Sequence, residues 1–250
     1  MYNYQDWDSF CNYLIGENRY ILNDKYKKLT EEILKLAKDR EVFLEQGSIF
    51  WRAKTSKGLR VAEDGEIVSD KYTQEEMSAP PKEKAKDGRA NPAGISYLYL
   101  AEDLETAVAE IKPFIGDRIT IASFTLNKKI KIVDIRKNAP SLLEAIQSKD
   151  KNSFDHLWFG IKMYFSVPIK PEDPKRYIPT QYLAELFKNN GYDGVIFESV
   201  QKKGNFNLVL FNPSDAQLKN MEEGERYIEK IEYIDNIRVI KECLEKQNNS

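Results

Sequence analysis

Residues 89–110 have the sequence RANPAGISYLYLAEDLETAVAE, and this stretch decides the fold. Its proline and glycine are typical of a turn. Leucine and tyrosine alternate in residues 96–100, so a strand should place the two leucines on one face and the two tyrosines on the other. Asp103 can then cap a helix. The stretch therefore predicts a turn, a strand and a helix in succession.

The expected helix carries a buried stripe, because Leu104, Ala107, Val108 and Ile111 recur at helical spacing. Glu110 lies beside this stripe, near the expected C-terminal end of the helix. The helix dipole disfavours an anion there. A carboxylate at this position needs a partner or a function.

The rest of the chain mixes strands and helices without regular alternation, which favours an α+β fold over a doubly wound sheet. Runs rich in β-branched and aromatic residues predict strands, and amphipathic runs predict helices. The predicted strands are 48–53, 118–126, 130–135, 194–200 and 207–211, and the predicted helices are 142–146 and 181–189. Clustered prolines and glycines predict loop-rich stretches at 55–92 and 163–180.

Three segments are expected along the chain. Residues 1–46 read as a helical N-terminal extension, because apolar residues recur at helical spacing among lysines and glutamates. Residues 47–220 form the main domain, with a mixed β core and flanking helices. Residues 221–250 form a tail, for which a strand followed by a helix is favoured over a single helix.

Composition excludes several classes of protein. The 250 residues are 41% hydrophobic and 31% charged, with a net charge of -2. Binding to nucleic acid is not expected, because no basic excess is visible. The chain has no apolar run of about 18 residues or more and no secretory leader, so we expect a cytoplasmic protein without a membrane span. Cys11 and Cys243 lie far apart, which fits a reducing compartment.

Common catalytic motifs are missing from the sequence. His156 is the single histidine and there is no Cys-x-x-Cys, so no bound metal is expected. His156 stands in an aromatic stretch and is interpreted as a packed residue. The chain has no Gly-x-Ser-x-Gly elbow, no phosphate loop ending in Gly-Lys-Ser/Thr and no Gly-x-Gly-x-x-Gly.

Five short motifs follow one another in a recognisable order. They are FWRA (50–53), RANPAG (89–94), YLYLAED running into AVAE (97–110), GYDGVIFES (191–199) and NLVLFNP (207–213). This succession, across residues 48–215, resembles the RES-domain family, which takes its name from an arginine, a glutamate and a serine. The chain departs from the compact family pattern in its N-terminal extension, its long loop between Arg52 and Arg89, and its long tail.

The resemblance implies an ADP-ribosyltransferase-like fold and a toxin-like enzyme that consumes NAD+. Breaking the bond between nicotinamide and ribose, with water or phosphate as acceptor, develops positive charge on the ribose. Glu110 is the candidate anion for that charge. The family's arginine and serine match Arg52 and Ser199. Ser199 lacks an evident base, so we expect it to form hydrogen bonds rather than to act as a nucleophile.

Further residues are candidates for contact with NAD+. Arg52 and Arg89 suit the pyrophosphate, because a guanidinium matches phosphate oxygens. Tyr99 could stack on a ring or donate its hydroxyl to a ribose, and Asn91 and Asn207 are candidates for hydrogen bonds. No metal is implied.

Two other functions remain open. One is transfer of ADP-ribose to a macromolecule, which shares the first step. The other is a catalytically inactive NAD-binding or protein-interaction module. A toxin directed at nucleic acid would need a basic groove that the composition does not indicate. Because toxin-like members of the family are usually held by a neutralising partner, we also expect an antitoxin or immunity protein.

Overall fold

The computed structural model describes residues 2–61, 63, 65, 67–69, 72–147, 154–167, 173–221, 226–234 and 237–244. The helices are α1 (Tyr4–Gly16), α2 (Asp24–Lys38), α3 (Gln74–Met77), α4 (Leu104–Glu110), α5 (Leu142–Gln147), α6 (Phe154–Ser166) and α7 (Ile178–Asn189), with 3-10 turns η1 (Lys82–Lys84), η2 (Pro174–Tyr177) and η3 (Pro213–Asp215). The strands are β1 (Glu41–Leu44), β2 (Ile49–Thr55), β3 (Leu59–Val61), β4 (Ile67–Ser69), β5 (Leu98–Ala101), β6 (Arg118–Leu126), β7 (Ile130–Asp134), β8 (Gly194–Glu198), β9 (Phe206–Leu210), β10 (Ala216–Met221), β11 (Arg226–Ile234) and β12 (Ile237–Leu244).

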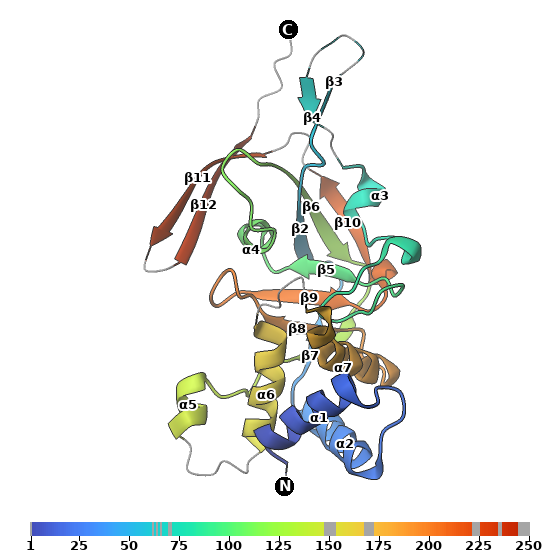
Figure 1. Ribbon diagram of the computed structural model, residues 1–250. Coiled ribbons are helices and arrows are strands. Elements are labelled where there is room, and N and C mark those ends of the chain that lie inside the picture. Colours follow the sequence, from blue (N-terminus) through green and yellow to red (C-terminus); the bar gives the residue numbers. More distant parts are fainter. Residues whose placement is uncertain are drawn as a thin grey trace.

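A ten-stranded mixed sheet organises the molecule (Figure 1). Its order is β1-β7-β8-β9-β5-β2-β6-β11-β12, and β10 also pairs with β6. Within the described residues, β7 and β8 are the one parallel pair of this sheet. Helices flank the sheet without alternating regularly with strands. The predicted α+β class with a mixed β core is therefore confirmed.

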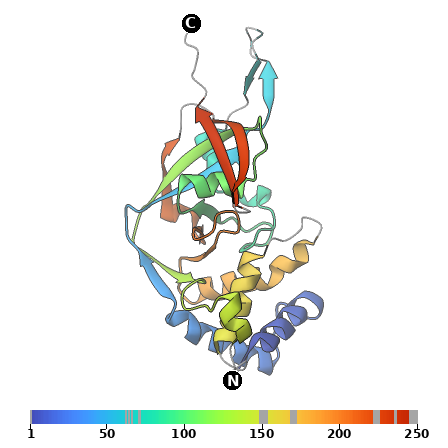
Figure 2. The same cartoon turned by 90° about the vertical axis from the view of Figure 1, so that its left-hand side faces the viewer.

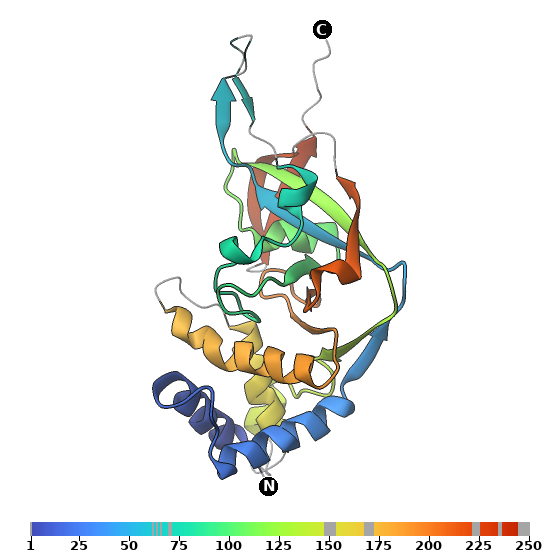
Figure 3. The ribbon, with the colours of Figure 1, turned by 90° about the vertical axis from the view of Figure 1, so that its right-hand side faces the viewer.

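The sheet divides into two halves between β2 and β5. β2 pairs with β6 from Ile49 to Thr55, and β5 pairs with β9 from Leu98 to Ala101. Between them, β2 and β5 pair only at Trp51 and Ala101. Figure 3 shows the chain joining the halves twice, from β1 into β2 and from β6 into β7. The sheet is thus open in its middle, while these two connections join the halves.

Apolar side chains fill both faces of the sheet. As predicted, Leu98 and Leu100 of β5 face one core, while Tyr97 and Tyr99 face the other. The second of these cores lies under α1, α2, α6 and α7, at the end of the molecule opposite the β3–β4 hairpin (Figure 1). Helix α4 covers a smaller core over β2 and β6. Among the described residues, no helix is both long and apolar enough to cross a membrane.

The N-terminal residues are helical as predicted, with one exception. Residues 41–44 form β1, which pairs antiparallel with β7, so the expectation of helix up to residue 46 is wrong there. Helices α1 and α2 share a core with α6 and α7, where Trp7 and Leu29 are fully buried. Helices α1 and α2 and strand β1 are therefore packed into the main body of the fold.

Two stretches that were expected to be loops contain regular structure. Within 163–180, α6 runs to Ser166, and both η2 and α7 begin before residue 180. The prolines misled this prediction, because Pro174 and Pro179 stand at first helical positions, where proline is tolerated. Within 55–92, the chain forms the β3–β4 hairpin, α3 and η1.

The described residues of the tail form a β-hairpin, so the expected terminal helix is wrong for them. β11 and β12 pair along their length, and β11 joins the end of β6 through Arg226 opposite Ile119. Figure 2 shows this hairpin beside β6. The isoleucines and valine of 226–240 favour extended backbone, and this preference outweighs the helical spacing that the charged residues suggest.

Replacing Gly160 of α6 should loosen the contact between α1 and α6. A Cβ there would lie 2.7 Å from Cδ1 of Trp7 and 3.0 Å from Cδ2 of Tyr4. Trp7 is fully buried and cannot move aside. We expect Gly160→Ala to lower the free energy of unfolding by about 1–3 kcal/mol, measured by urea denaturation. Gly16→Ala in α1 is the control, because no atom lies within 4 Å of its added Cβ. Equal stability of the two variants would contradict this contact.

Candidate functional site

A cavity of about 370 Å³ opens where β2 and β5 separate. This volume lies in the range of about 300–1,000 Å³ that is usual for small-molecule sites. Its walls come from β2, β5, α4, β8, β9, η2 and the loop that precedes β5. The lining residues are Trp51, Arg52, Ala53, Arg89, Tyr99, Leu100, Ala101, Ala107, Glu110, Ile111, Tyr177, Phe197 and Asn207.

Glu110 is the one carboxylate among the described residues that line this cavity. Its Oε1 accepts hydrogen bonds from Ser199 Oγ at 2.6 Å and from Asn207 Nδ2 at 2.7 Å. Both donors are neutral, and no described cation forms an ion pair with Glu110. The structure therefore brings together three residues that the sequence singled out far apart in the chain, and Oε2 is left without a hydrogen bond from the described residues.

The segment after β8 holds α4 at both ends. Ser199 binds Glu110 at the last residue of α4. At the other end, Asp103 caps Thr106 N at 2.7 Å, which confirms the predicted cap. The same Asp103 accepts hydrogen bonds from Lys202 Nζ at 3.0 Å and from Asn205 Nδ2 at 2.7 Å. The position of Glu110 is thus fixed along the helix axis as well as at its carboxylate.

Arg52 lies on β2 and reaches the cavity without a carboxylate partner among the described residues. Its Nη1 donates to the carbonyl of Ser78 at 3.1 Å. Burial lowers the pKa of Arg52 to about 10, because a desolvated guanidinium loses hydration. An anionic ligand would restore the interactions that this cation lacks.

Arg89 lies in the loop before β5 and is bound to the end of α6. Its two terminal nitrogens donate to the carbonyls of Tyr164 at 2.9 Å and Val167 at 3.1 Å. Its guanidinium lies 5.8 Å from the ring centroid of Phe197. Burial lowers the pKa of Arg89, while the nearby Glu110 carboxylate opposes this shift. Like Arg52, it has main-chain acceptors and no described ion pair.

Tyr99 lines the cavity, but its hydroxyl is already used within the protein. It accepts a hydrogen bond from Ala90 N at 2.9 Å and donates to Asn91 Oδ1 at 2.7 Å. Burial raises the pKa of this phenol. Gly88 in the same turn leaves room for these contacts, since a Cβ there would lie 2.5 Å from Asn91 Oδ1 and 2.7 Å from the Tyr99 hydroxyl. Tyr99 therefore fixes the loop that carries Arg89.

Asn91 is buried in the same loop and is not among the residues that line the cavity. Its Nδ2 lies within hydrogen-bond distance of the carbonyls of Lys86, Pro92 and Ile95. The expected contact between Asn91 and NAD+ thus gains no support from its position. The Asn91 amide instead bonds to main-chain carbonyls of its own loop.

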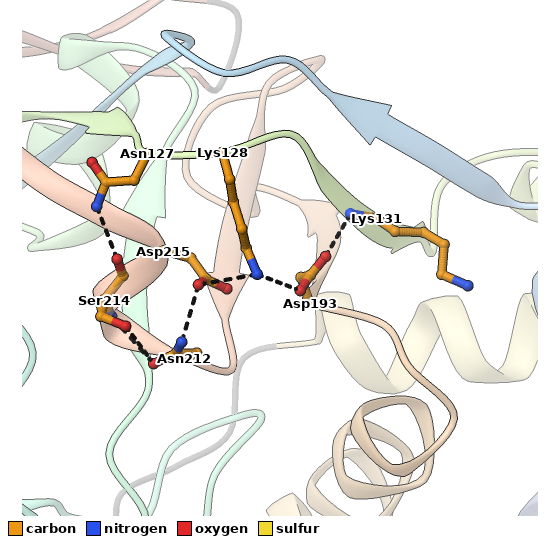
Figure 4. A network of polar contacts seen from close by, with 7 residues as sticks. All are labelled: Asn127, Lys128, Lys131, Asp193, Asn212, Ser214 and Asp215. Atoms are coloured by element: carbon orange, nitrogen blue, oxygen red, sulfur yellow. Dashed lines mark hydrogen bonds and ion pairs between the residues drawn. The ribbon is translucent and has the colours of Figure 1, made fainter.

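Other residues of the recognised motifs stabilise the fold and do not line the cavity. Figure 4 shows Lys128 between Asp193 and Asp215, at 3.1 Å and 3.2 Å. Asn212 donates to Asp215 at 3.0 Å. These contacts tie the start of β8 to the turns that follow β6 and β9, outside the cavity. His156 is buried, with Nε2 3.0 Å from the carbonyl of Ala145, as expected for a packed histidine.

Three aromatic residues line the cavity without having been singled out from the sequence. Phe197 stands two residues before Ser199, so alternation along β8 could have found it. Trp51 is adjacent to Arg52, and alternation would have placed it on the opposite face of β2. Tyr177 gave no signal, because it falls in the stretch 163–180 that was expected to be a loop.

Comparison with protein families identifies the chain. The model of the RES domain matches residues 51–229. The chain belongs to the RES-domain family. Helices α1 and α2 and strand β1 precede the matched region, and the hairpin β11–β12 extends beyond it.

A search of solved structures found similarity to a toxin–antitoxin complex. The crystal structure of the M. tuberculosis MbcT–MbcA toxin–antitoxin complex contains a chain with 14% identity and a TM-score of 0.40, and the match covers 77% of this RES-domain chain and 91% of that chain. No curated protein matches the sequence. Within the described residues, no group of three or more histidine, cysteine, aspartate or glutamate side chains is placed to hold a metal ion.

Removing the Tyr99 hydroxyl should destabilise the loop that carries Arg89. Tyr99→Phe leaves Ala90 N and Asn91 Oδ1 without their partner in a buried place. We expect a loss of about 1–3 kcal/mol in the free energy of unfolding, measured by urea denaturation. Tyr182→Phe is the matched control, because the Tyr182 hydroxyl makes no hydrogen bond to the described residues. A Tyr99→Phe protein that unfolds like this control would refute the assigned role.

Proposed function

We propose that this RES-domain protein binds NAD+ in the cavity between β2 and β5 and cleaves the bond between nicotinamide and ribose. The observation that carries the proposal is the charge pattern of the cavity. One carboxylate, Glu110, shares the cavity with Arg52 and Arg89, which have no described ion pairs. This pattern suits a ligand with two negative charges and a centre that becomes positive during the reaction.

The two arginines fit the pyrophosphate of NAD+. Guanidinium groups match phosphate oxygens in geometry and stay charged when buried. Both currently donate to main-chain carbonyls, at 2.9–3.1 Å. A phosphate oxygen carries negative charge, which a carbonyl oxygen does not, and a phosphate can accept two parallel hydrogen bonds from one guanidinium. The aromatic rings of Trp51, Tyr99 and Phe197 offer apolar walls for the planar rings of the ligand.

Glu110 is the proposed stabiliser of the ribose cation. When the bond breaks, its electron pair leaves with nicotinamide, and positive charge builds on the ribose. A fixed anion beside that charge lowers the barrier, because the site needs no reorganisation during the reaction. Oε1 holds the carboxylate in place through Ser199 and Asn207, which leaves Oε2 for the ligand. An oxygen of water or phosphate then forms a bond to the ribose carbon that nicotinamide has left, and a proton is released from the acceptor.

Ser199 is proposed as a positioning residue for Glu110. Its hydroxyl donates to Glu110 and accepts from Gln201 N at 3.2 Å and Lys202 N at 3.1 Å. With these three bonds its hydrogen-bonding capacity is filled. The described base within reach of this hydroxyl is Glu110 itself. The proposal uses that carboxylate for the ribose cation, so a nucleophilic serine is not part of it.

The biological setting is part of the proposal as well. An enzyme that destroys NAD+ in the cytoplasm is toxic to its own cell, so we propose that a neutralising protein restrains it. The first step is shared with transfer of ADP-ribose to a macromolecule, and the products of the assay below separate these possibilities.

Glu110→Gln tests the chemistry without removing the hydrogen bonds of Oε1. The amide oxygen can accept from both Ser199 and Asn207, but it carries no charge. We expect kcat for nicotinamide release to fall about a hundredfold to a thousandfold, with a folded protein. The measurement is chromatography of NAD+, nicotinamide and ADP-ribose or its phosphorylated form.

Glu198→Gln serves as the control for this experiment. Glu198 lies on β8 next to Ser199, but it pairs with Lys162 at 3.3 Å and does not line the cavity. Its variant should release nicotinamide like the wild type. Wild-type protein that binds NAD+ without releasing nicotinamide would overturn the proposed cleavage and favour transfer to an absent acceptor or an inactive binding module.

A further inference from the structure

The cavity contains two tyrosines, Tyr99 and Tyr177, and they differ in what their hydroxyls do. The Tyr99 hydroxyl donates to Asn91 and accepts from Ala90, so it has no proton left for a ligand. The Tyr177 hydroxyl makes no hydrogen bond within the described part of the chain. Tyr177 is half-buried, and its side chain faces the same cavity as the two arginines.

Tyr177 and Arg89 lie close to each other. The Tyr177 phenol interacts electrostatically with the Arg89 guanidinium and with Tyr99. The buried Thr180 also links the two segments that carry these residues. Its hydroxyl lies 2.5 Å from the Arg89 carbonyl and 3.0 Å from the Tyr177 carbonyl. Gln181 adds hydrogen bonds to the carbonyls of Gly88 and Asn91, at 3.1 Å and 3.0 Å.

The start of α7 therefore presents Tyr177 and Arg89 as one unit. Arg89 offers a charged donor and Tyr177 a neutral donor, both without an anionic partner among the described residues. A pair of this kind suits an anion with several oxygens, such as a phosphate group. Tyr177 comes from η2, far in sequence from Arg52 and Arg89. It therefore contributes to the cavity wall from outside the five recognised motifs.

We propose that the Tyr177 hydroxyl donates a hydrogen bond to the pyrophosphate held by Arg89, and that Thr180 positions the two residues for this contact. This inference deepens the proposed function and rests on the same cavity. The sequence suggested Tyr99 as a donor to a ribose, whereas the donor here is Tyr177 and its acceptor is the pyrophosphate.

ADP is the probe for this contact, because it carries the pyrophosphate but has no nicotinamide bond to cleave. Titration calorimetry would compare ADP affinity in the wild type and in Tyr177→Phe, which removes the hydroxyl and keeps the ring. We expect ADP to bind about tenfold more weakly or worse, since a hydrogen bond to a charged acceptor is lost. Tyr182→Phe on α7 should bind ADP like the wild type.

Thr180 provides a second, independent variant. Thr180→Val should weaken ADP binding in a folded protein, and Thr180→Ser, which keeps the hydroxyl, should restore it. Urea denaturation of each variant establishes that the protein is folded. Full restoration by serine distinguishes positioning through the hydroxyl from a general packing role.

The outcomes separate this inference from the proposed function. If Tyr177→Phe binds ADP as tightly as the wild type while the wild type cleaves NAD+, the inference is overturned and the function stands. If Tyr177→Phe weakens ADP binding but the wild type does not cleave NAD+, the inference stands and the function is overturned. Wild-type protein that binds neither ADP nor NAD+ overturns both.

Discussion

The limited pairing between β2 and β5 is the constraint on which the rest of the structure depends. These strands are neighbours in the sheet but meet only at Trp51 and Ala101. Strands that separate expose side chains from both faces, which is why Arg52 and Ala53, on opposite faces of β2, line the same cavity. The chain crosses this opening twice, from β1 into β2 and from β6 into β7, and the crossing strands pair within each half, β1 with β7 and β2 with β6.

The charge of Glu110 at the end of α4 is held in the cavity by neutral donors. Glu110 stands at the C-terminal end of this helix, where the dipole disfavours an anion. Ser199 and Asn207 compensate with two short hydrogen bonds rather than with a cation. A cation in direct contact would neutralise the carboxylate, whereas neutral donors hold it and leave its charge in the cavity. The arrangement thus retains the property that the proposed chemistry uses.

Features that local sequence patterns determine were predicted correctly. Features that depend on packing between residues far apart in the sequence were not. The alternation of leucine and tyrosine placed β5 correctly, and Asp103 marked the start of α4. Tyr99 was expected to contact NAD+ and lies in the cavity wall, but its bonds to the preceding loop depend on a turn that no periodicity reveals. The prolines near Tyr177 concealed η2 and the start of α7, so a residue of the cavity wall was missed.

The N-terminal helices are connected to the cavity through one residue of α6. The Tyr164 hydroxyl lies 3.3 Å from Asp8 of α1, while the Tyr164 carbonyl accepts a hydrogen bond from Arg89 at 2.9 Å. Helix α1 itself is seated on α6 by the close approach of Trp7 to Gly160. Although the RES-domain match begins only at residue 51, the helices before it support the helix that holds a cavity arginine. Sequence boundaries therefore do not separate this extension from the site, because packing in the helical core joins the two.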